Sequence, residues 1–415
     1  MNDDYVLAGR TLRREKAGRA DWTLWLAAAL LFVGSLLIFR WEDRFPFTDM
    51  HVHTMIARDF DFTDLHSITS RLAYPLWHLC TSALYQLGMP VEWASATVCA
   101  LCKTAALFLA RGYALVALGD GAKPRTATLA ALCTTLVTGL CLPWFNPRVY
   151  QGIGSPNAWH NPTQLAVNVS MLLCVPYVVH CWYDFERRLP GEGERTALPW
   201  RKVVTLAVLL MASLACKPTF MQALLPAAFV FFAIEWARRP KNWRYFLQII
   251  LAFLPAAAYF LLQYLYYTGV VVEFTSGVEF CLSWKTAATT LRNLLLMNAF
   301  PLVAMLCVPR DELRKDRALR LTLWMLLFAA LEAMSLCETG LREGHGNFTW
   351  ALNSVSLMLW VLMIGRFLRA ARTARAERIG GLRRALLACG WALLVWHVGS
   401  GLHYLYFLLS TGNAF

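Results

Sequence analysis

Charged residues are scarce in this chain, since only 16% of its 415 residues are Asp, Glu, Lys or Arg. In average soluble domains, charged residues make up about a quarter of the chain. The long apolar runs are each close to the roughly 20 residues that a bilayer requires. They lack strict two-residue alternation, which argues against a β-barrel. We therefore expect an all-α polytopic membrane protein, with 1–415 forming a single transmembrane domain.

No small-residue cleavage site follows the first apolar run, 22–39, which is also long for a signal peptide. We expect this run to be retained as the first of about eleven spans. The predicted spans are 22–39, 91–118, 126–143, 164–182, 202–216, 218–236, 245–268, 289–308, 320–336, 347–365 and 385–409.

The segment 71–88 is apolar, but we do not count it as a span. It is rich in Trp, Tyr and His, which favour the membrane surface. Counting it would also send the most basic later loops to the opposite side. We therefore expect 40–90 to be a long outer loop with juxtamembrane helices.

Acidic residues are fewer than basic ones, and the net charge is +13. On a soluble protein this would suggest nucleic acid, but Lys and Arg retained in the cytoplasm also set membrane orientation. The inner connections hold 28 of the 39 Lys and Arg, and the outer ones hold nine. We expect a cytoplasmic tail at 1–21, an outer C-terminus, the lipid bilayer as partner, and no nucleic acid.

Most of the 12 Cys lie within apolar runs, where a free thiol behaves as a small hydrophobic group. Cys281 and Cys337 are different, because both fall in predicted outer loops. They could form a disulfide, and the sequence leaves that pairing open.

The stretch that follows the first span contains Asp49, His51 and His53 within five residues. If it is helical, Asp49 and His53 share a face; if it is extended, all three do. One use is general base chemistry at Asp49. A second is a divalent metal held by D-x-H-x-H, and the third alternative is a solvated polar loop.

The next predicted outer loop, 142–164, has four Pro and two Gly, as expected for an ordered, turn-rich connection. Four residues could bind and stack on a sugar, namely Asn157, Trp159, His160 and Asn161, and Arg148 could meet a phosphate. The alternative is that they are ordinary interfacial and turn residues.

Lys217 lies at the predicted outer turn between two spans, just before Pro218, which breaks the helix. It could pair with a lipid-linked phosphate or extend to the headgroups. Further candidates for binding an anionic substrate at the outer face are Arg58, Arg71, Arg148, Arg342 and His345.

These features resemble the GT-C superfamily of membrane glycosyltransferases. The matching pieces are a first span followed by an acidic residue early in a long outer loop, then a turn of the R-x-x-x-P-L-W type, then a Lys-Pro hairpin. In this chain they are Thr48-Asp49, His53, Ala57-Arg58, Arg71 to Trp77, and Lys217-Pro218. The chain has no D-x-D or D-x-E at Asp49, so a metal role has less support.

The resemblance implies a polyprenyl-phosphate-linked sugar as donor and a glycan, lipid or protein as acceptor, with inverting transfer at the extracytoplasmic face of a bacterial plasma membrane. Asp49 would be the base, and basic residues such as Arg58, Lys217 and Arg342 would bind the leaving phosphate. The alternatives are a transporter or flippase of an anionic lipid-linked saccharide, and an O-antigen polymerase or ligase.

Overall fold

The computed structural model of the chain describes residues 21–63, 73–119, 122–145, 154–188, 197–267, 276–340, 346–376 and 380–411. The helices of the first half are α2 (Trp22–Glu42), α3 (Asp49–Arg58), α5 (Leu76–Gln86), α6 (Val91–Leu118), α7 (Pro124–Leu136), α8 (Pro162–Arg188) and α9 (Trp200–Cys216). The second half contains α10 (Thr219–Arg238), η3 (Pro240–Asn242), α11 (Trp243–Tyr267), β1 (Ser276–Phe280), α12 (Trp284–Cys307), α13 (Arg310–Lys315), α14 (Arg317–Ser335), β2 (Leu336–Gly340), η4 (Asn347–Thr349), α15 (Trp350–Ala376) and α16 (Gly381–Thr411).

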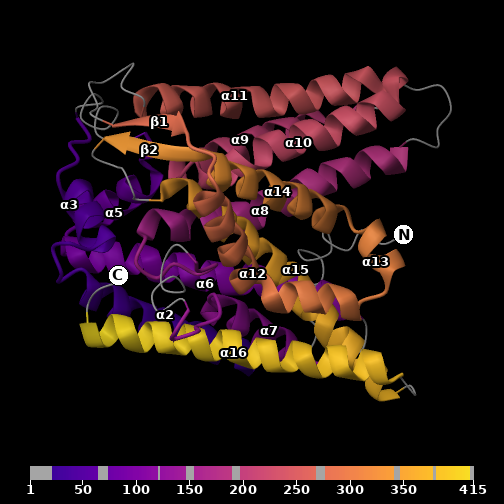
Figure 1. Ribbon diagram of the computed structural model, residues 1–415. Coiled ribbons are helices and arrows are strands. Elements are labelled where there is room, and N and C mark those ends of the chain that lie inside the picture. Colours follow the sequence, from indigo (N-terminus) through magenta and orange to yellow (C-terminus); the bar gives the residue numbers. More distant parts are fainter. Residues whose placement is uncertain are drawn as a thin grey trace.

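The long helices run side by side as one bundle, with short elements at both ends (Figure 1). One end carries α3, α5 and the β1–β2 pair, and we call it the site end. The opposite end carries α13. The first and last described parts of the chain lie at opposite ends, as expected if an odd number of crossings separates them.

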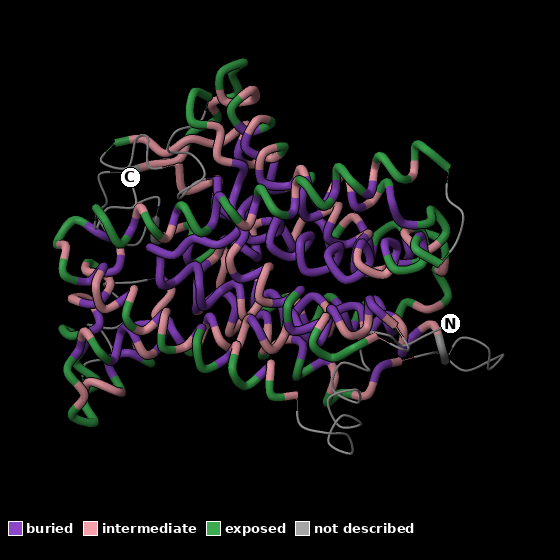
Figure 2. Tube along the Cα trace, turned by 90° about the horizontal axis from the view of Figure 1, so that it is seen from below, coloured by how far each residue is buried: buried purple, intermediate pink, exposed green. Residues whose placement is uncertain are grey.

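Among the residues that the structure describes, nine helices are long and apolar enough to cross a membrane, so this is a polytopic membrane protein. The core is formed around α15, of which 94% of the most apolar window is buried. Outer helices such as α2 and α16 expose much of their apolar surface (Figure 2). That pattern is expected for a bundle whose outer face meets lipid rather than water.

Two of the eleven predicted spans correspond to helices with fewer than the 18 residues that the other nine exceed. The predicted span 126–143 is α7, which has 13 residues and ends at Leu136. At about 1.5 Å per residue this helix is too short for a bilayer core of about 30 Å. Residues beyond it are held by other helices: the Leu140 N–H donates to the Leu296 carbonyl and the Cys141 N–H to the Ser400 hydroxyl. The predicted span 202–216 is α9, with 17 residues.

The described part of the predicted outer loop 40–90 contains two short helices, α3 and α5, both at the site end (Figure 1). The segment 71–88 contributes α5, whose 11 residues are too few to span a membrane.

A two-stranded antiparallel sheet was not expected in an all-α protein. β1 pairs with β2 in the register Ser276 to Gly340 and Phe280 to Leu336. Cys337, within β2, forms a disulfide with Cys281, which directly follows β1, so the pairing that the sequence left open is present. The sheet and the disulfide join segments that precede α12 and follow α14.

Candidate functional site

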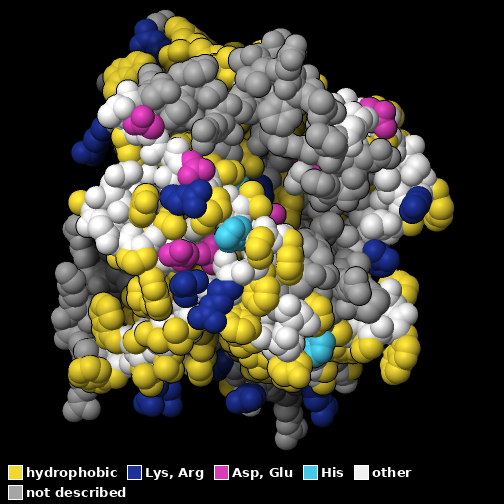
Figure 3. Space-filling model, turned by 90° about the vertical axis from the view of Figure 1, so that its left-hand side faces the viewer, with side chains coloured by type: hydrophobic (Ala, Val, Ile, Leu, Met, Phe, Trp, Pro, Cys, Tyr) yellow, Lys and Arg dark blue, Asp and Glu magenta, His cyan; other side chains and the backbone are white. Residues whose placement is uncertain are grey.

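A pocket of about 380 Å³ lies at the site end and is the candidate functional site. Its size is within the range of about 300–1,000 Å³ that is typical of ligand sites. Acidic, basic and histidine side chains gather on this end of the molecule (Figure 3). The lining residues are Asp49, Val52, His53, Tyr74, Asn161, Lys217, Pro218, Thr219, Gln222, Phe260, Gln263, Tyr264, Gly277, Val278, Glu338, Asn347 and Phe348.

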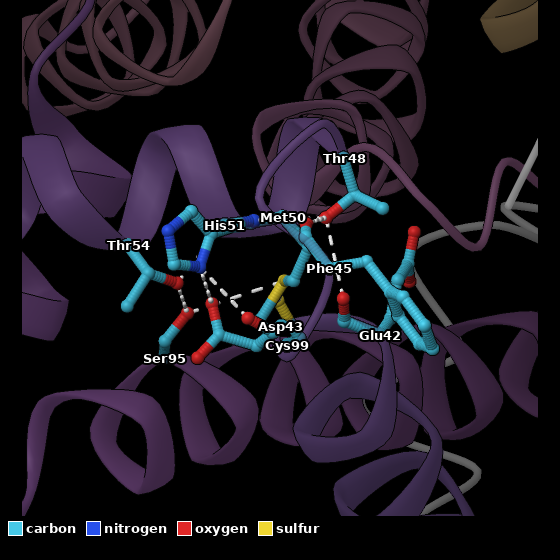
Figure 4. Close-up of polar contacts among 9 residues, drawn as sticks. All are labelled: Glu42, Asp43, Phe45, Thr48, Met50, His51, Thr54, Ser95 and Cys99. Carbon is cyan, nitrogen blue, oxygen red and sulfur yellow. Dashed lines mark hydrogen bonds and ion pairs between the residues drawn. The ribbon is translucent and has the colours of Figure 1, made fainter. Parts of the chain in front are cut away.

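The start of α3 positions Asp49. Thr48 caps this helix, because its hydroxyl accepts a hydrogen bond from the His51 N–H at 3.2 Å (Figure 4). Asp49 is therefore the first helical residue, where a carboxylate interacts favourably with the helix dipole. The helical form also puts Asp49 and His53 one turn apart, and both line the pocket, as predicted for a helix.

Asn161 caps α8 and connects two of the charged groups of the pocket, Asp49 and Lys217. Its Oδ1 accepts a hydrogen bond from the Gln164 N–H at 3.0 Å, as expected for a cap before Pro162. The same oxygen accepts from the Lys217 ammonium at 3.2 Å. The Asn161 amide nitrogen donates to Asp49 Oδ2 at 2.9 Å. One amide therefore contacts the carboxylate with one end and the ammonium with the other.

Lys217 lies between α9 and α10, and the proline that follows it restricts its backbone conformation. A residue before proline prefers the extended region, and Lys217 has φ −175° and ψ 143°. Its side chain is buried, and its Nζ lies 4.7 Å from the centre of the Trp350 ring. Burial lowers the pKa of Lys217 to about 8, although the nearby carboxylates of Asp49 and Glu338 oppose this shift.

His53 pairs with His78 of α5. Their Nδ1 and Nε2 atoms are 2.8 Å apart, so one ring donates to the other. Burial lowers the pKa of His53 to about 4, and Lys217 contributes to this shift while Asp49 opposes it. Burial likewise lowers the pKa of His78, with a further contribution from His53. Both rings are therefore neutral near pH 7, and they fix the wall of the pocket beside Asp49.

His51 points away from Asp49 and is not among the residues that line the pocket. Its Nδ1 donates to the Asp43 carbonyl at 2.8 Å and lies 3.7 Å from an Asp43 carboxylate oxygen (Figure 4). The side chains of the D-x-H-x-H motif therefore do not converge. Within the described ranges, no group of three or more His, Cys, Asp or Glu side chains is arranged to hold a metal ion.

Asn157 and Trp159, two of the predicted sugar-binding residues, are buried away from the pocket. Asn157 donates to the carbonyls of Thr134 and Val137 at 2.7 and 2.8 Å. The Nζ of Lys103 lies 3.8 Å from the centre of the Trp159 ring. The pair thus holds the loop after α7 and stabilises the Lys103 ammonium within a span.

His160 is buried behind the pocket. Its Nδ1 lies 2.8 Å from the Tyr404 hydroxyl, and its ring lies 5.7 Å from that of Trp350. Burial lowers the pKa of His160 to about 4, with Lys217 contributing and Asp49 opposing. His160 therefore packs against Trp350, the ring beside the Lys217 ammonium, and does not line the pocket.

The predicted basic residues divide into two groups. Arg58 is exposed outside the pocket, and its Nε donates to Asp59 at 2.9 Å. The other four lie outside the residues that the structure describes: Arg71, Arg148, Arg342 and His345. Lys217 is thus the predicted cation that the structure brings to Asp49.

Sequence reasoning missed several polar residues of the pocket. Glu338 on β2 accepts two hydrogen bonds from the Asn347 amide, at 2.8 and 2.9 Å. Gln222 and Gln263 interrupt apolar helices, a pattern that often marks function in a membrane. Their Oε1 atoms are buried and have no hydrogen-bond partner among the described residues. Amide oxygens accept hydrogen bonds from hydroxyl or amino hydrogens, and buried ones are usually paired.

The pocket therefore combines two carboxylates, a buried ammonium and two glutamine side chains at one end of a membrane-spanning bundle. No protein-family model matches the chain, and comparison with curated proteins finds no significant match.

Proposed function

We propose that this protein is a glycosyltransferase that moves a sugar from a polyprenyl-phosphate donor to an acceptor hydroxyl. One observation carries the proposal: Asp49 and Lys217 line the same pocket and are joined through Asn161. A base and a phosphate-binding cation are the two groups that the resemblance to GT-C enzymes requires.

In the proposed reaction, Asp49 accepts the proton of the acceptor hydroxyl. The hydroxyl oxygen then bonds to the anomeric carbon as the bond from that carbon to the phosphate oxygen breaks. The leaving polyprenyl phosphate takes the electron pair, and the configuration at the anomeric carbon inverts. Lys217 stabilises the negative charge that develops on the phosphate.

The electrostatics of Lys217 suit this role. With a pKa of about 8, most Lys217 side chains carry a proton at neutral pH. A phosphate at Nζ would favour the charged form. Because Asn161 separates Lys217 from Asp49, the carboxylate stays available as a base instead of being consumed in a direct ion pair.

The sugar would lie between the ionic groups and the acceptors on α10 and α11. Gln222 and Gln263 offer unused oxygens, and Glu338 is held in place by Asn347. Amide and carboxylate oxygens are suitable partners for sugar hydroxyls. This arrangement supports a saccharide as the polar part of the ligand.

The disulfide supports an extracytoplasmic site. Cys337 directly precedes Glu338, and Cys281 follows the strand that contributes Gly277 and Val278 to the pocket. Disulfides persist in oxidising compartments and are rare in the cytosol. We therefore propose that the site end faces outward from a bacterial plasma membrane, with α7, α9 and their adjoining chain completing eleven crossings.

The test uses purified protein in proteoliposomes with a polyprenyl-phosphate sugar and membrane acceptors. A transferase releases free polyprenyl phosphate in proportion to the glycosylated acceptor. A transporter moves the intact lipid-linked saccharide across the bilayer and releases none. Translocation without phosphate release would overturn the proposal. The Lys217→Met variant should release much less polyprenyl phosphate than the Lys202→Met control. Lys202 is a suitable control position because its ammonium pairs with Asp184 instead.

A further inference from the structure

A second, wholly apolar groove of about 270 Å³ lies between α10 and α11. Its walls include the aromatic rings of Phe232 and Phe253, whose centres are 6.4 Å apart. Between the aromatic side chains lie three alanines, Ala228, Ala233 and Ala257. Alternation of large and small side chains gives a corrugated surface, into which a chain with short branches can interdigitate.

The groove continues the pocket along the same two helices. On α10 the last pocket residue is Gln222 and the first groove residue is Leu225. On α11 the groove ends at Ala257 and the pocket begins at Phe260. Residues three apart on a helix lie on the same face. Polar pocket and apolar groove are thus successive parts of one α10–α11 face.

An aromatic pair bounds the far end of the groove, and one side is open. Trp236 and Phe246 both line the groove and stack with ring centres 5.7 Å apart and planes at 11°. Phe229 and Leu254 also line it and are exposed on the lipid-facing surface, at 75% and 56%. A ligand can therefore enter sideways from the bilayer and extend from the pocket towards Trp236.

The length and charge of this path fit one kind of ligand. From Thr219 to Trp236 the helix rises about 25 Å at 1.5 Å per residue, most of a hydrocarbon core of about 30 Å. A cation, Lys217, stands at one end, and apolar side chains follow. The matching ligand has an anionic head and one long apolar chain.

We propose that the α10–α11 groove binds the branched isoprenoid chain of a polyprenyl phosphate whose phosphate lies at Lys217. This rests on the proposed function for the identity of the head, and it adds the path of the tail. Moving a tail from lipid into an apolar groove gains no hydrophobic energy. The groove therefore acts through shape, selecting a branched chain over straight acyl chains and aligning its head with Asp49.

The experiment uses purified protein in phosphatidylglycerol nanodiscs and a long-chain polyprenyl phosphate that carries a terminal diazirine and no sugar. Illumination should label peptides from α10 and α11 near Trp236 and Phe246. Ala233→Trp and Ala257→Trp fill the groove and should weaken binding of this probe about tenfold. Leu251→Trp, on α11 but outside the groove lining, should bind it like the wild type, and geranyl phosphate should bind all four proteins equally.

Ala233 is exposed, so its replacement should leave the melting temperature unchanged. The photolabelling of the wild-type protein tests the path of the tail independently of the tryptophan variants. Labelling confined to other helices would overturn the proposal. So would equal labelling of the groove by a photoreactive phosphatidylglycerol, if polyprenyl phosphate does not displace that lipid.

The photolabelling assay contains no sugar, so no transfer takes place in it. If transfer is absent but the groove is labelled, the proposed function fails and the groove stands. If transfer occurs and both tryptophan variants match Leu251→Trp, the groove fails alone.

Discussion

The side-chain amide of Asn161 donates a hydrogen bond to the Asp49 carboxylate at 2.9 Å. This contact joins the first turn of α3 to the cap of α8, two elements separated by 112 positions in the chain. It leaves the second carboxylate oxygen of Asp49 to the pocket, and it orients the first one through an amide that is itself fixed by Lys217 and the α8 backbone.

Asn161→Ser tests whether this contact matters for the reaction. Serine preserves the cap of α8 but cannot reach both Asp49 and Lys217, so the rate of transfer should fall about 10- to 100-fold. The melting temperature should change little, because Ser and Asn cap helices about equally well. Asn161→Ala should lose the cap as well, costing about 1 kcal/mol of stability. A serine variant as active as the wild type would show that the contact is only structural.

The pH dependence of donor capture should report Lys217. Its ammonium is present below its pKa of about 8 and is lost as the pH rises through that value. Since kcat/KM reports the free enzyme, it should fall above pH 8. The fall in kcat should come at higher pH, because the bound phosphate holds the proton on Lys217. Lys217→Arg should remove this fall, since guanidinium stays protonated. A wild-type profile that stays flat well above pH 8 would contradict the role given to Lys217.

The Cys281–Cys337 disulfide should stabilise the wall of the pocket that contains Glu338. It links residues 56 positions apart, and closing a loop of that length is worth on the order of 4 kcal/mol in the chain-entropy model. The Cys281→Ser/Cys337→Ser double variant should have a lower melting temperature and a higher KM for the donor. Cys80→Ser, at an exposed free thiol, is the control. Equal melting temperatures for the two would refute the stabilising role.

The side of the membrane that the pocket faces can be measured by labelling. Single cysteines are introduced at Phe62, which is exposed near α3 at the site end, and at Gly193, between α8 and α9. The background has the ten free cysteines replaced by serine and keeps the disulfide. In intact cells, an impermeant maleimide should label position 62 and not position 193. The reverse pattern would place the pocket in the cytoplasm.

Local patterns predicted much of the site. The spacing of Asp49 and His53 placed both on one helical face, and both line the pocket. Lys217-Pro218 predicted a helix break, and the extended conformation before proline turns Lys217 towards Asn161. These inferences succeeded because each depends on a few neighbouring residues.

Long-range packing accounts for the failures. Asn157 and Trp159 have the composition of a sugar-binding loop, but they serve the backbone after α7 and the ammonium of Lys103. Composition cannot distinguish sugar binding from this structural use, because the partners of Asn157 and Trp159 come from α6, from α7 and from the residue after α7. Glu338 and Asn347 likewise depend on a sheet whose strands are far apart in the chain. For 126–143, hydropathy predicted one continuous helix, but the helix ends at Leu136 because the chain beyond it hydrogen-bonds to α12 and α16.

The most direct test of the account is the release of polyprenyl phosphate by Asp49→Asn, compared with Asp59→Asn. Asp59 is exposed, pairs with Arg58 and lies outside the pocket, so it is a matched control for losing one carboxylate. Asp49→Asn should bind the donor with wild-type affinity but release phosphate about 10²- to 10⁴-fold more slowly, as expected for loss of a general base. Asp59→Asn should release it at the wild-type rate. Wild-type release by Asp49→Asn would contradict the central claim that Asp49 takes the proton from the acceptor.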